Sequence, residues 1–137
     1  MAITFQMHEI SMRLPGRVKL KSWVRRVLRN EGKKEGEISF VLTSDERLFE
    51  MNVTFLAHDT YTDIITFDQS EGQVVSGDIV ISRDRVKENA AGYGIAFDEE
   101  LRRVMIHGVL HLCGYKDKTD QEQQVMRAKE EESLRIF

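Results

Sequence analysis

Apolar and polar residues alternate over several short stretches of the chain, and this period of two predicts β-strands. The alternation is regular over residues 3–8 and again over residues 37–42. Residues 62–67 and 74–81 are two further stretches that we expect to be strands. The pattern therefore predicts four strands.

Elsewhere the apolar residues recur every three or four positions, which predicts amphipathic helices. After a Pro-Gly pair, this spacing joins Val18, Trp23, Val24, Val27 and Leu28. Ser44 is expected to cap a second helix that continues to Phe55. A third helix is predicted over residues 84–93, with Gly92 or Gly94 at its end.

The last two predicted helices each begin with a capping signal. Asp98 is expected to cap a long, largely apolar helix that runs to Cys113. Thr119 and Glu122 have the spacing of a capping box at the start of the final helix. Four strands and about five helices predict an α+β fold in a single domain over residues 1–137, with the apolar helix packed in the core.

The composition is that of a globular protein without membrane segments. Hydrophobic residues make up 41% of the chain and charged residues 31%, and no apolar run approaches the roughly 20 residues that span a bilayer. The N-terminus has no basic segment followed by an apolar stretch and a cleavage site, so the cytoplasm is the expected compartment. The single cysteine excludes an internal disulfide and suits a reducing compartment.

The net charge of −3 does not indicate nucleic-acid binding, for which a basic surface is usual. Basic residues nevertheless concentrate in residues 17–34, whereas residues 130–132 make the C-terminal segment acidic. The members of the basic cluster are Arg17, Lys19, Lys21, Arg25, Arg26, Arg29, Lys33 and Lys34. Such a run is a solvated helix face or, if it lies beside a functional site, a nucleic-acid contact.

Two histidines on the long apolar helix, with a carboxylate just beyond its end, have the spacing of a metal site. His107 and His111 lie one turn apart and only about 40° apart around a helix, so both imidazoles can reach one ion. Gly114 can end the helix in the left-handed conformation, which lets Asp117 return toward the same point. Three protein ligands are typical of catalytic zinc. Hydrogen-bonded core histidines beside an ordinary loop carboxylate are the alternative.

Cys113 is a further residue of ligand type next to this pair. It follows His111 by two positions, which places it about 200° around the helix and away from the histidine face. We therefore expect Cys113 to be a small buried hydrophobic residue.

Three parts of the chain carry a resemblance to a known family. The first reads His107-Gly108-x-Leu110-His111-Leu112-x-Gly114-Tyr115. Residues 62–67 (TDIITF) and 77–82 (GDIVIS) are the other two, and Glu100-Leu101 precedes the histidine helix. In this order, over most of residues 40–126, they resemble the YbeY family of metal-dependent endoribonucleases, which act in ribosomal RNA maturation.

The resemblance implies a mixed four-stranded sheet with helices around it, and a metal-dependent, single-strand endoribonuclease acting in ribosomal RNA maturation and ribosome quality control. The implied partners are ribosomal RNA and the small ribosomal subunit, with no membrane. A non-catalytic ribosome assembly factor with a structural metal ion and a metallohydrolase with a non-RNA substrate are the alternatives. A zinc-protease helix carries Glu directly after its first His, so Gly108 argues against a peptidase.

The sequence departs from the family pattern at the third ligand. The family usually has His where this chain has Asp117, and Asp where it has Lys116. A carboxylate can replace imidazole at zinc, but it lowers the charge of the site by one unit. Two His and one carboxylate also suit other ions, so the divalent cation is expected to be zinc, with nickel, manganese, iron or cobalt as alternatives. Asp120 is the second choice for the third ligand.

A second departure removes a cation, because Leu56 stands where the family usually carries Arg. Catalytic residues therefore stay open, and each candidate also has a structural interpretation. The candidates are Arg83, Arg103 and Lys116 for phosphate, Asp59, Asp63 and Asp78 for positioning water, and His58 as an acid or base.

Overall fold

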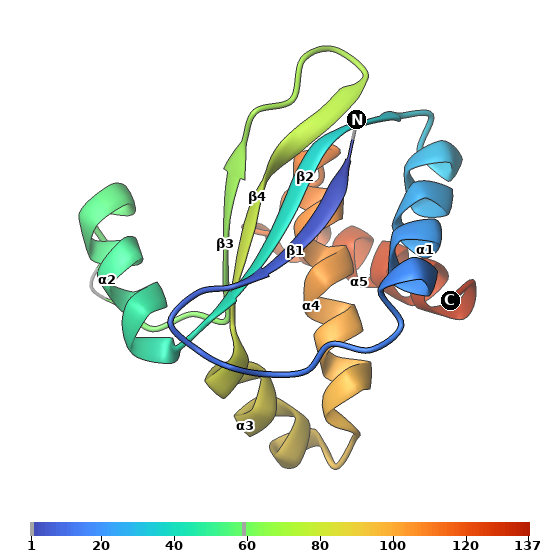
Figure 1. The fold of residues 1–137 in the computed structure, drawn as a ribbon. Coiled ribbons are helices and arrows are strands. Elements are labelled where there is room, and N and C mark those ends of the chain that lie inside the picture. Colours follow the sequence, from blue (N-terminus) through green and yellow to red (C-terminus); the bar gives the residue numbers. More distant parts are fainter. Residues whose placement is uncertain (1, 59) are drawn as a thin grey trace.

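The observed helices and strands follow the patterning of the sequence. The computed structural model describes residues 2–58 and 60–137, and over these residues it contains four strands and five helices (Figure 1). In chain order they are β1 (Ile3–Met7), α1 (Arg17–Asn30), β2 (Lys34–Thr43), α2 (Asp45–Leu56), β3 (Ile64–Asp68), β4 (Val74–Ser82), α3 (Arg83–Tyr93), α4 (Phe97–Leu112) and α5 (Asp120–Arg135). The predicted α+β class is confirmed.

The strands form one mixed sheet in the order β1-β2-β4-β3. β1, β2 and β4 run parallel, and β3 pairs with β4 in the antiparallel direction at the edge. Alternation along β2 buries Ile38, Phe40 and Leu42 on one face, as the period of two predicts. The mixed sheet implied by the family resemblance is thereby confirmed.

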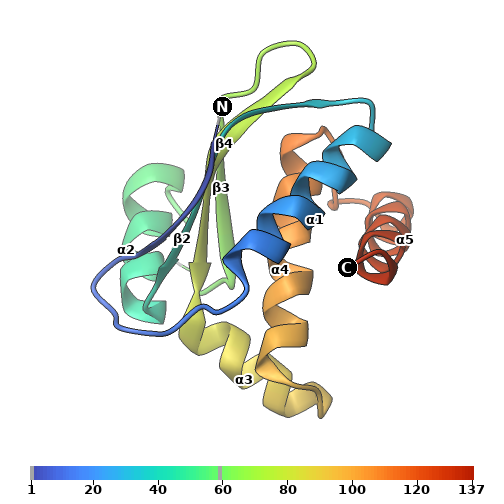
Figure 2. The ribbon, with the colours of Figure 1, turned by 45° about the vertical axis from the view of Figure 1, so that its right-hand side comes forward.

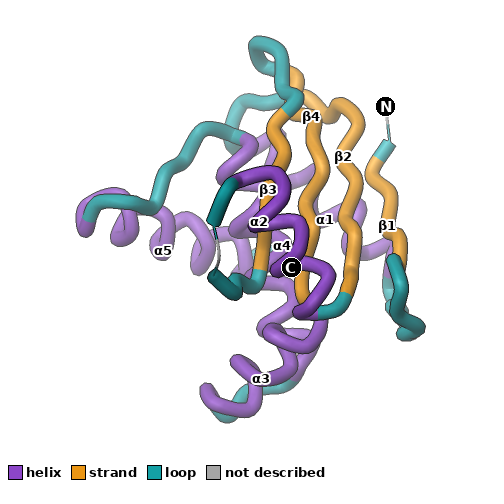
Figure 3. Tube along the Cα trace, turned by 90° about the vertical axis from the view of Figure 1, so that its left-hand side faces the viewer, coloured by secondary structure: helices purple, strands orange, loops and turns teal. Residues whose placement is uncertain are grey.

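Helices cover the two faces of the sheet unequally. α1, α4 and α5 lie on one face, and α2 lies on the other (Figures 2 and 3). The larger core is on the first face, where Phe40 and Ile79 of the sheet pack with Ile106 and Leu110 of α4. No helix formed by residues 2–58 and 60–137 is long and apolar enough to cross a membrane.

α4 is the apolar helix that the sequence places in the core, and this prediction is confirmed. Its buried residues are Glu100, Leu101, Val104, Met105, Ile106, Gly108, Val109, Leu110 and Leu112. The absence of a side chain at Gly108 lets the helix lie close to the sheet. A Cβ atom there would lie 2.7 Å from Cγ2 of Ile79 and 2.9 Å from Cδ1 of Ile64, which is too close for either methyl group to stay in place.

Most helix ends agree with the capping signals in the sequence. The Ser44 hydroxyl accepts a hydrogen bond from the Arg47 N–H, and Thr119 and Glu122 form the predicted capping box. The expected cap at Asp98 is wrong, because α4 begins two residues earlier than predicted, with Ala96 as its N-cap. Asp98 instead lies in the first turn, where its charge still favours the helix dipole.

Val18 is the second exception to the predicted pattern. It is 84% exposed, although its spacing placed it on the apolar face of the first helix. Val18 lies in the first turn of α1, before the buried residues of the helix, which begin at Leu20.

We expect Gly108→Ala to lower the free energy of unfolding by about 1–2 kcal/mol, because overpacking against Ile79 and Ile64 outweighs the gain in helix propensity. Gly92→Ala is the matched control. It lies in α3 with open space around its Cα, so the same change should be stabilising by up to about 1 kcal/mol. Urea unfolding of both variants measures the difference, and equal stabilities would contradict the close contact at Gly108.

Candidate metal centre

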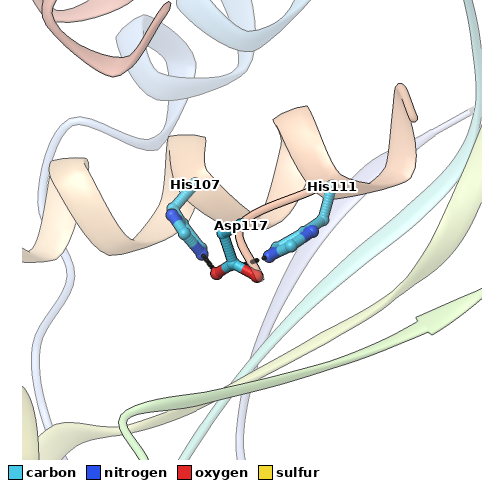
Figure 4. Close-up of side chains that lie close together, drawn as sticks. All are labelled: His107, His111 and Asp117. Atoms are coloured by element: carbon cyan, nitrogen blue, oxygen red, sulfur yellow. Dashed lines mark hydrogen bonds and ion pairs between the residues drawn. The ribbon is translucent and has the colours of Figure 1, made fainter. Parts of the chain in front are cut away.

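The end of α4 is shaped so that the chain returns toward the helix it has just left. Gly114 has φ of 110°, a conformation that favours glycine. The Gly114 N–H donates to the His111 carbonyl and the Tyr115 N–H to the Leu110 carbonyl, which is the Schellman pattern of a helix C-terminus. The following turn carries Asp117 back to the histidine face of α4 (Figure 4).

The two histidines and Asp117 converge on one point. Oδ2 of Asp117 lies 3.3 Å from Nε2 of His107 and 3.3 Å from Nε2 of His111. One ligand atom from each residue lies within 4.8 Å of the others, and all three residues are half-buried. The structure therefore brings together the three residues that the sequence indicated as metal ligands.

Hydrogen bonds on the far side of each ring fix which nitrogen faces this point. Nδ1 of His111 is 2.9 Å from the Tyr115 carbonyl oxygen, which can only accept, so Nδ1 carries the hydrogen. Nδ1 of His107 is 2.5 Å from Oε2 of Glu130 and donates to that carboxylate. Both Nε2 atoms are then left to face Asp117.

This donor set fits a divalent cation. In the neutral rings, two Nε2 lone pairs and one carboxylate oxygen face the same point, and they need a positive charge between them, from a proton or a metal ion. Metal-binding histidines commonly donate the other ring N–H to a carboxylate or a backbone carbonyl, as His107 and His111 do here. His107, His111 and Asp117 are thus the residues that could hold an ion.

The charges around His107 raise its pKa. Burial by itself acts to lower the pKa, but the hydrogen bond and charge of Glu130, with the charges of Asp117 and Asp63, outweigh it. A proton therefore competes with a metal ion for this imidazole more strongly than for an isolated histidine.

A second set of contacts holds the turn that carries the Tyr115 carbonyl. The Tyr115 hydroxyl donates to Oε1 of Glu31 at 2.5 Å, and Lys129 of α5 donates to Oε2 of the same carboxylate at 3.2 Å. Glu31 follows α1 directly, so the turn is tied to both α1 and α5. Cys113 is half-buried rather than buried as predicted, but it packs against the core, and burial raises the pKa of its thiol to about 11.

His107 and Asp117 of the candidate metal centre line a cleft of about 580 Å³ between α4, α5 and the start of β3. It is lined by Asp63, Ile64, Tyr93, Ile95, Glu100, Arg103, Val104, His107, Asp117, Arg127, Glu130 and Glu131. Nη1 of Arg103 donates to Oε1 of Glu130 at 3.2 Å, so Glu130 joins Arg103 to His107. Five carboxylates face two guanidinium groups, and the cleft is acidic before any cation binds.

Two of these carboxyl groups, Asp63 and Glu100, are hard to ionise. Burial raises the pKa of both above their usual values. Glu100 is only 3% exposed, and its Oε1 has no hydrogen-bond partner among the residues that the structure describes. The part of the cleft lined by Asp63 and Glu100 therefore carries less negative charge than two ionised carboxylates would give it.

Of the predicted helper residues, Arg103 and Asp63 line this cleft. Arg83 lies at the start of α3 and pairs with Asp84, outside the cleft. Lys116 borders a separate groove with Gly114 and Val125. These positions favour Arg103 over the other two predicted phosphate contacts.

The remaining predicted residues lie elsewhere. Asp78 lines a groove on the α2 side of the sheet, and His58 is exposed just beyond α2. Asp120 is the first residue of α5 and lies outside the ligand cluster, while Asp59 is outside the described residues. No member of the basic cluster, all of which lies in the described part of the chain, lines the cleft.

Glu130 is the main site residue that sequence reasoning missed, since it was read only as part of an acidic run. Met126, Glu130 and Ser133 are the buried residues of α5, and they recur at positions i, i+4 and i+7. That spacing places Glu130 on the packed face of the helix and was available as a signal. The contact of the Tyr115 carbonyl with His111 had no signal in the sequence, because every residue has a backbone carbonyl and only the folded turn brings this one to the imidazole.

Known proteins are similar to this chain over nearly its whole length. A family model described as Endoribonuclease YbeY matches residues 4–137. A relative of that name from Christiangramia forsetii is 52% identical over 117 residues, which are 85% of this chain and 82% of the relative. Another from Parabacteroides distasonis is 43% identical over 137 residues, 100% of this chain and 96% of the relative. A solution structure from Thermotoga maritima has a TM-score of 0.68 and 28% identity, covering 97% of this chain and 87% of that one.

We expect Glu130→Gln to weaken binding of a divalent cation about 10- to 100-fold, because the neutral amide replaces the charged carboxylate that accepts the hydrogen bond from Nδ1 of His107. Glu131→Gln is the matched control, since it removes the same charge from the next position, which does not bond to either histidine in the described structure. Calorimetric titration with zinc gives both affinities. Equal affinities for the two variants would contradict the role of Glu130.

Glu100 should make stability depend on pH. Its pKa is higher in the folded protein than its usual 4.5. The contribution of Glu100 to the free energy of unfolding is therefore most favourable below pH 4.5. It becomes less favourable as the pH rises from 4.5 to the pKa of the folded state, where the ionised side chain must be buried. Glu100→Gln should therefore raise the free energy of unfolding at neutral pH and have little effect below about pH 4. Urea unfolding at both pH values measures this. A variant that is less stable than wild type at neutral pH would contradict the prediction.

Proposed function

Because the chain belongs to the YbeY family of endoribonucleases, and so is a hydrolase that acts on RNA, we propose that it cleaves single-stranded ribosomal RNA in a metal-dependent reaction. The proposed role is in ribosomal RNA maturation and ribosome quality control, in the cytoplasm and in association with the small ribosomal subunit. The observation that carries the metal dependence is the convergence of His107, His111 and Asp117 at one point. We also propose that residues 1–137 act as one domain, which the family match over residues 4–137 supports.

Nε2 of His107, Nε2 of His111 and a carboxylate oxygen of Asp117 would hold the cation, with zinc as the first choice and nickel, manganese, iron or cobalt as alternatives. When bound, such an ion neutralises negative charge on a phosphate and lowers the pKa of a water molecule or a 2′-hydroxyl. Three protein ligands at the side of a cleft leave room for substrate, which favours a catalytic over a closed structural site.

Side chains around the ion take the remaining roles. Glu130 orients His107 and, through its other oxygen, Arg103, so the guanidinium group is held at the same side of the cleft as the imidazole. Asp63 lines the cleft and has a raised pKa, which suits a group that positions the attacking water or hydroxyl and takes up its proton. Arg103 supplies positive charge for the phosphate.

The first test is cleavage of single-stranded ribosomal RNA fragments by the zinc-loaded protein and by an identically prepared His111→Ala variant. We expect the variant to lose at least about a hundredfold in rate while its circular dichroism spectrum is retained, because a ligand of the ion is missing. Comparing the two preparations also controls for contaminating nucleases. Equal cleavage by the folded variant would overturn the metal-dependent proposal, as would cleavage by wild type that survives complete removal of metal by a chelator.

A further inference from the structure

The cleft continues well beyond the metal ligands. Glu100, Arg103 and His107 are spaced by three and four residues and therefore share one face of α4. Seven residues of α-helix cover about 10 Å, so the wall of the cleft extends by that distance from His107. An ion at the histidines occupies only one end, and the rest of the 580 Å³ is available to a bound molecule.

Two arginines line the cleft, and they differ in whether they form hydrogen bonds and ion pairs with other side chains. Arg103 is bonded to Glu130, which in turn orients His107. Arg127 lies on the exposed side of α5 and forms no ion pair or hydrogen bond with any residue in the described part of the chain. Its guanidinium group is therefore free to bind an anion, and its planar fork of donors matches a phosphate.

The other end of the cleft presents an unpartnered aromatic ring. Tyr93, the last residue of α3, is 68% exposed and lines the cleft together with Ile95. Its ring is neither stacked nor hydrogen-bonded to another described residue, in contrast to Tyr61, which stacks on Phe49 at 4.4 Å. An exposed aromatic face beside an apolar side chain is a surface on which a nucleobase stacks.

From these observations we propose that the cleft beyond the metal ligands binds one unpaired nucleotide of the RNA substrate, with its base on Tyr93 and a backbone phosphate on Arg127. The proposal rests on the proposed endoribonuclease function and names the substrate contacts. A base held on Tyr93 is not free to pair, so this site selects single-stranded RNA.

The experiment pairs protein variants with modified substrates. A single-stranded RNA oligomer is prepared with one base removed at each position in turn, and separately with one phosphate made neutral by methylphosphonate substitution. KM, kcat and binding by fluorescence anisotropy are measured for the zinc-loaded wild type, Tyr93→Leu, Tyr93→Phe, Arg127→Gln and Arg127→Lys. Arg135→Gln is the charge-matched control, because Arg135 is exposed on the same helix outside the cleft.

We expect Tyr93→Leu to raise KM about tenfold with a smaller effect on kcat, and Tyr93→Phe to restore the wild-type value because the ring is kept. Arg127→Gln should raise KM and reduce the slope of log binding constant against log salt by about 0.7, with Arg127→Lys in between and Arg135→Gln unchanged in KM. Removing one particular base should weaken RNA binding by wild type but not by Tyr93→Leu. Making one particular phosphate neutral should likewise weaken RNA binding by wild type but not by Arg127→Gln.

The proposal is overturned if the folded Tyr93→Leu and Arg127→Gln variants bind and cleave RNA with wild-type affinity and KM. It is also overturned if every RNA modification that weakens binding by wild type weakens binding by both variants to the same extent. Failure of the proposed function gives a different result, namely wild type that does not cleave. In that case the anisotropy measurements alone decide, because a nucleotide site requires the same paired losses in binding.

Discussion

The seating of α4 on the sheet at Gly108 is the contact on which the rest of the site depends. With no side chain at that position, the helix backbone lies against Ile79 of β4 and Ile64 of β3, closer than a Cβ atom would allow. His107 and His111 flank this contact, so the separation of their imidazoles is set by a buried helix and not by mobile loops. Gly108, which argued against a protease from sequence, thus has a packing reason to be there.

Electrostatics in the cleft are organised around Glu130. This carboxylate meets a guanidinium on one side and an imidazole on the other, so its charge is compensated although it is buried. Asp63 and Glu100 form no ion pair among the described residues, and burial raises their pKa values. The cleft is therefore less negative than its five carboxyl groups alone would make it.

The sequence predicted those features that depend on local periodicity and on residues close together in the chain. The four strands, the caps at Ser44 and Thr119, and the grouping of His107, His111 and Asp117 belong to this class. Contacts between distant segments carried weaker signals or none. Glu130 reaches His107 across 23 residues, and the Tyr115 turn is held by Glu31, 84 residues away. Neither pairing follows from spacing, because both require the packed positions of α1, α4 and α5.

The Schellman turn after α4 has a consequence for how the protein is assembled. All three candidate ligand residues fall within residues 107–117, so closing the loop that brings them together costs little chain entropy. The partners that orient the two rings differ in this respect, since the Tyr115 carbonyl lies in the same segment and Glu130 lies in α5. The grouping of the three side chains thus depends on local contacts, and docking of α5 adds Glu130 to a group that the local turn already assembles.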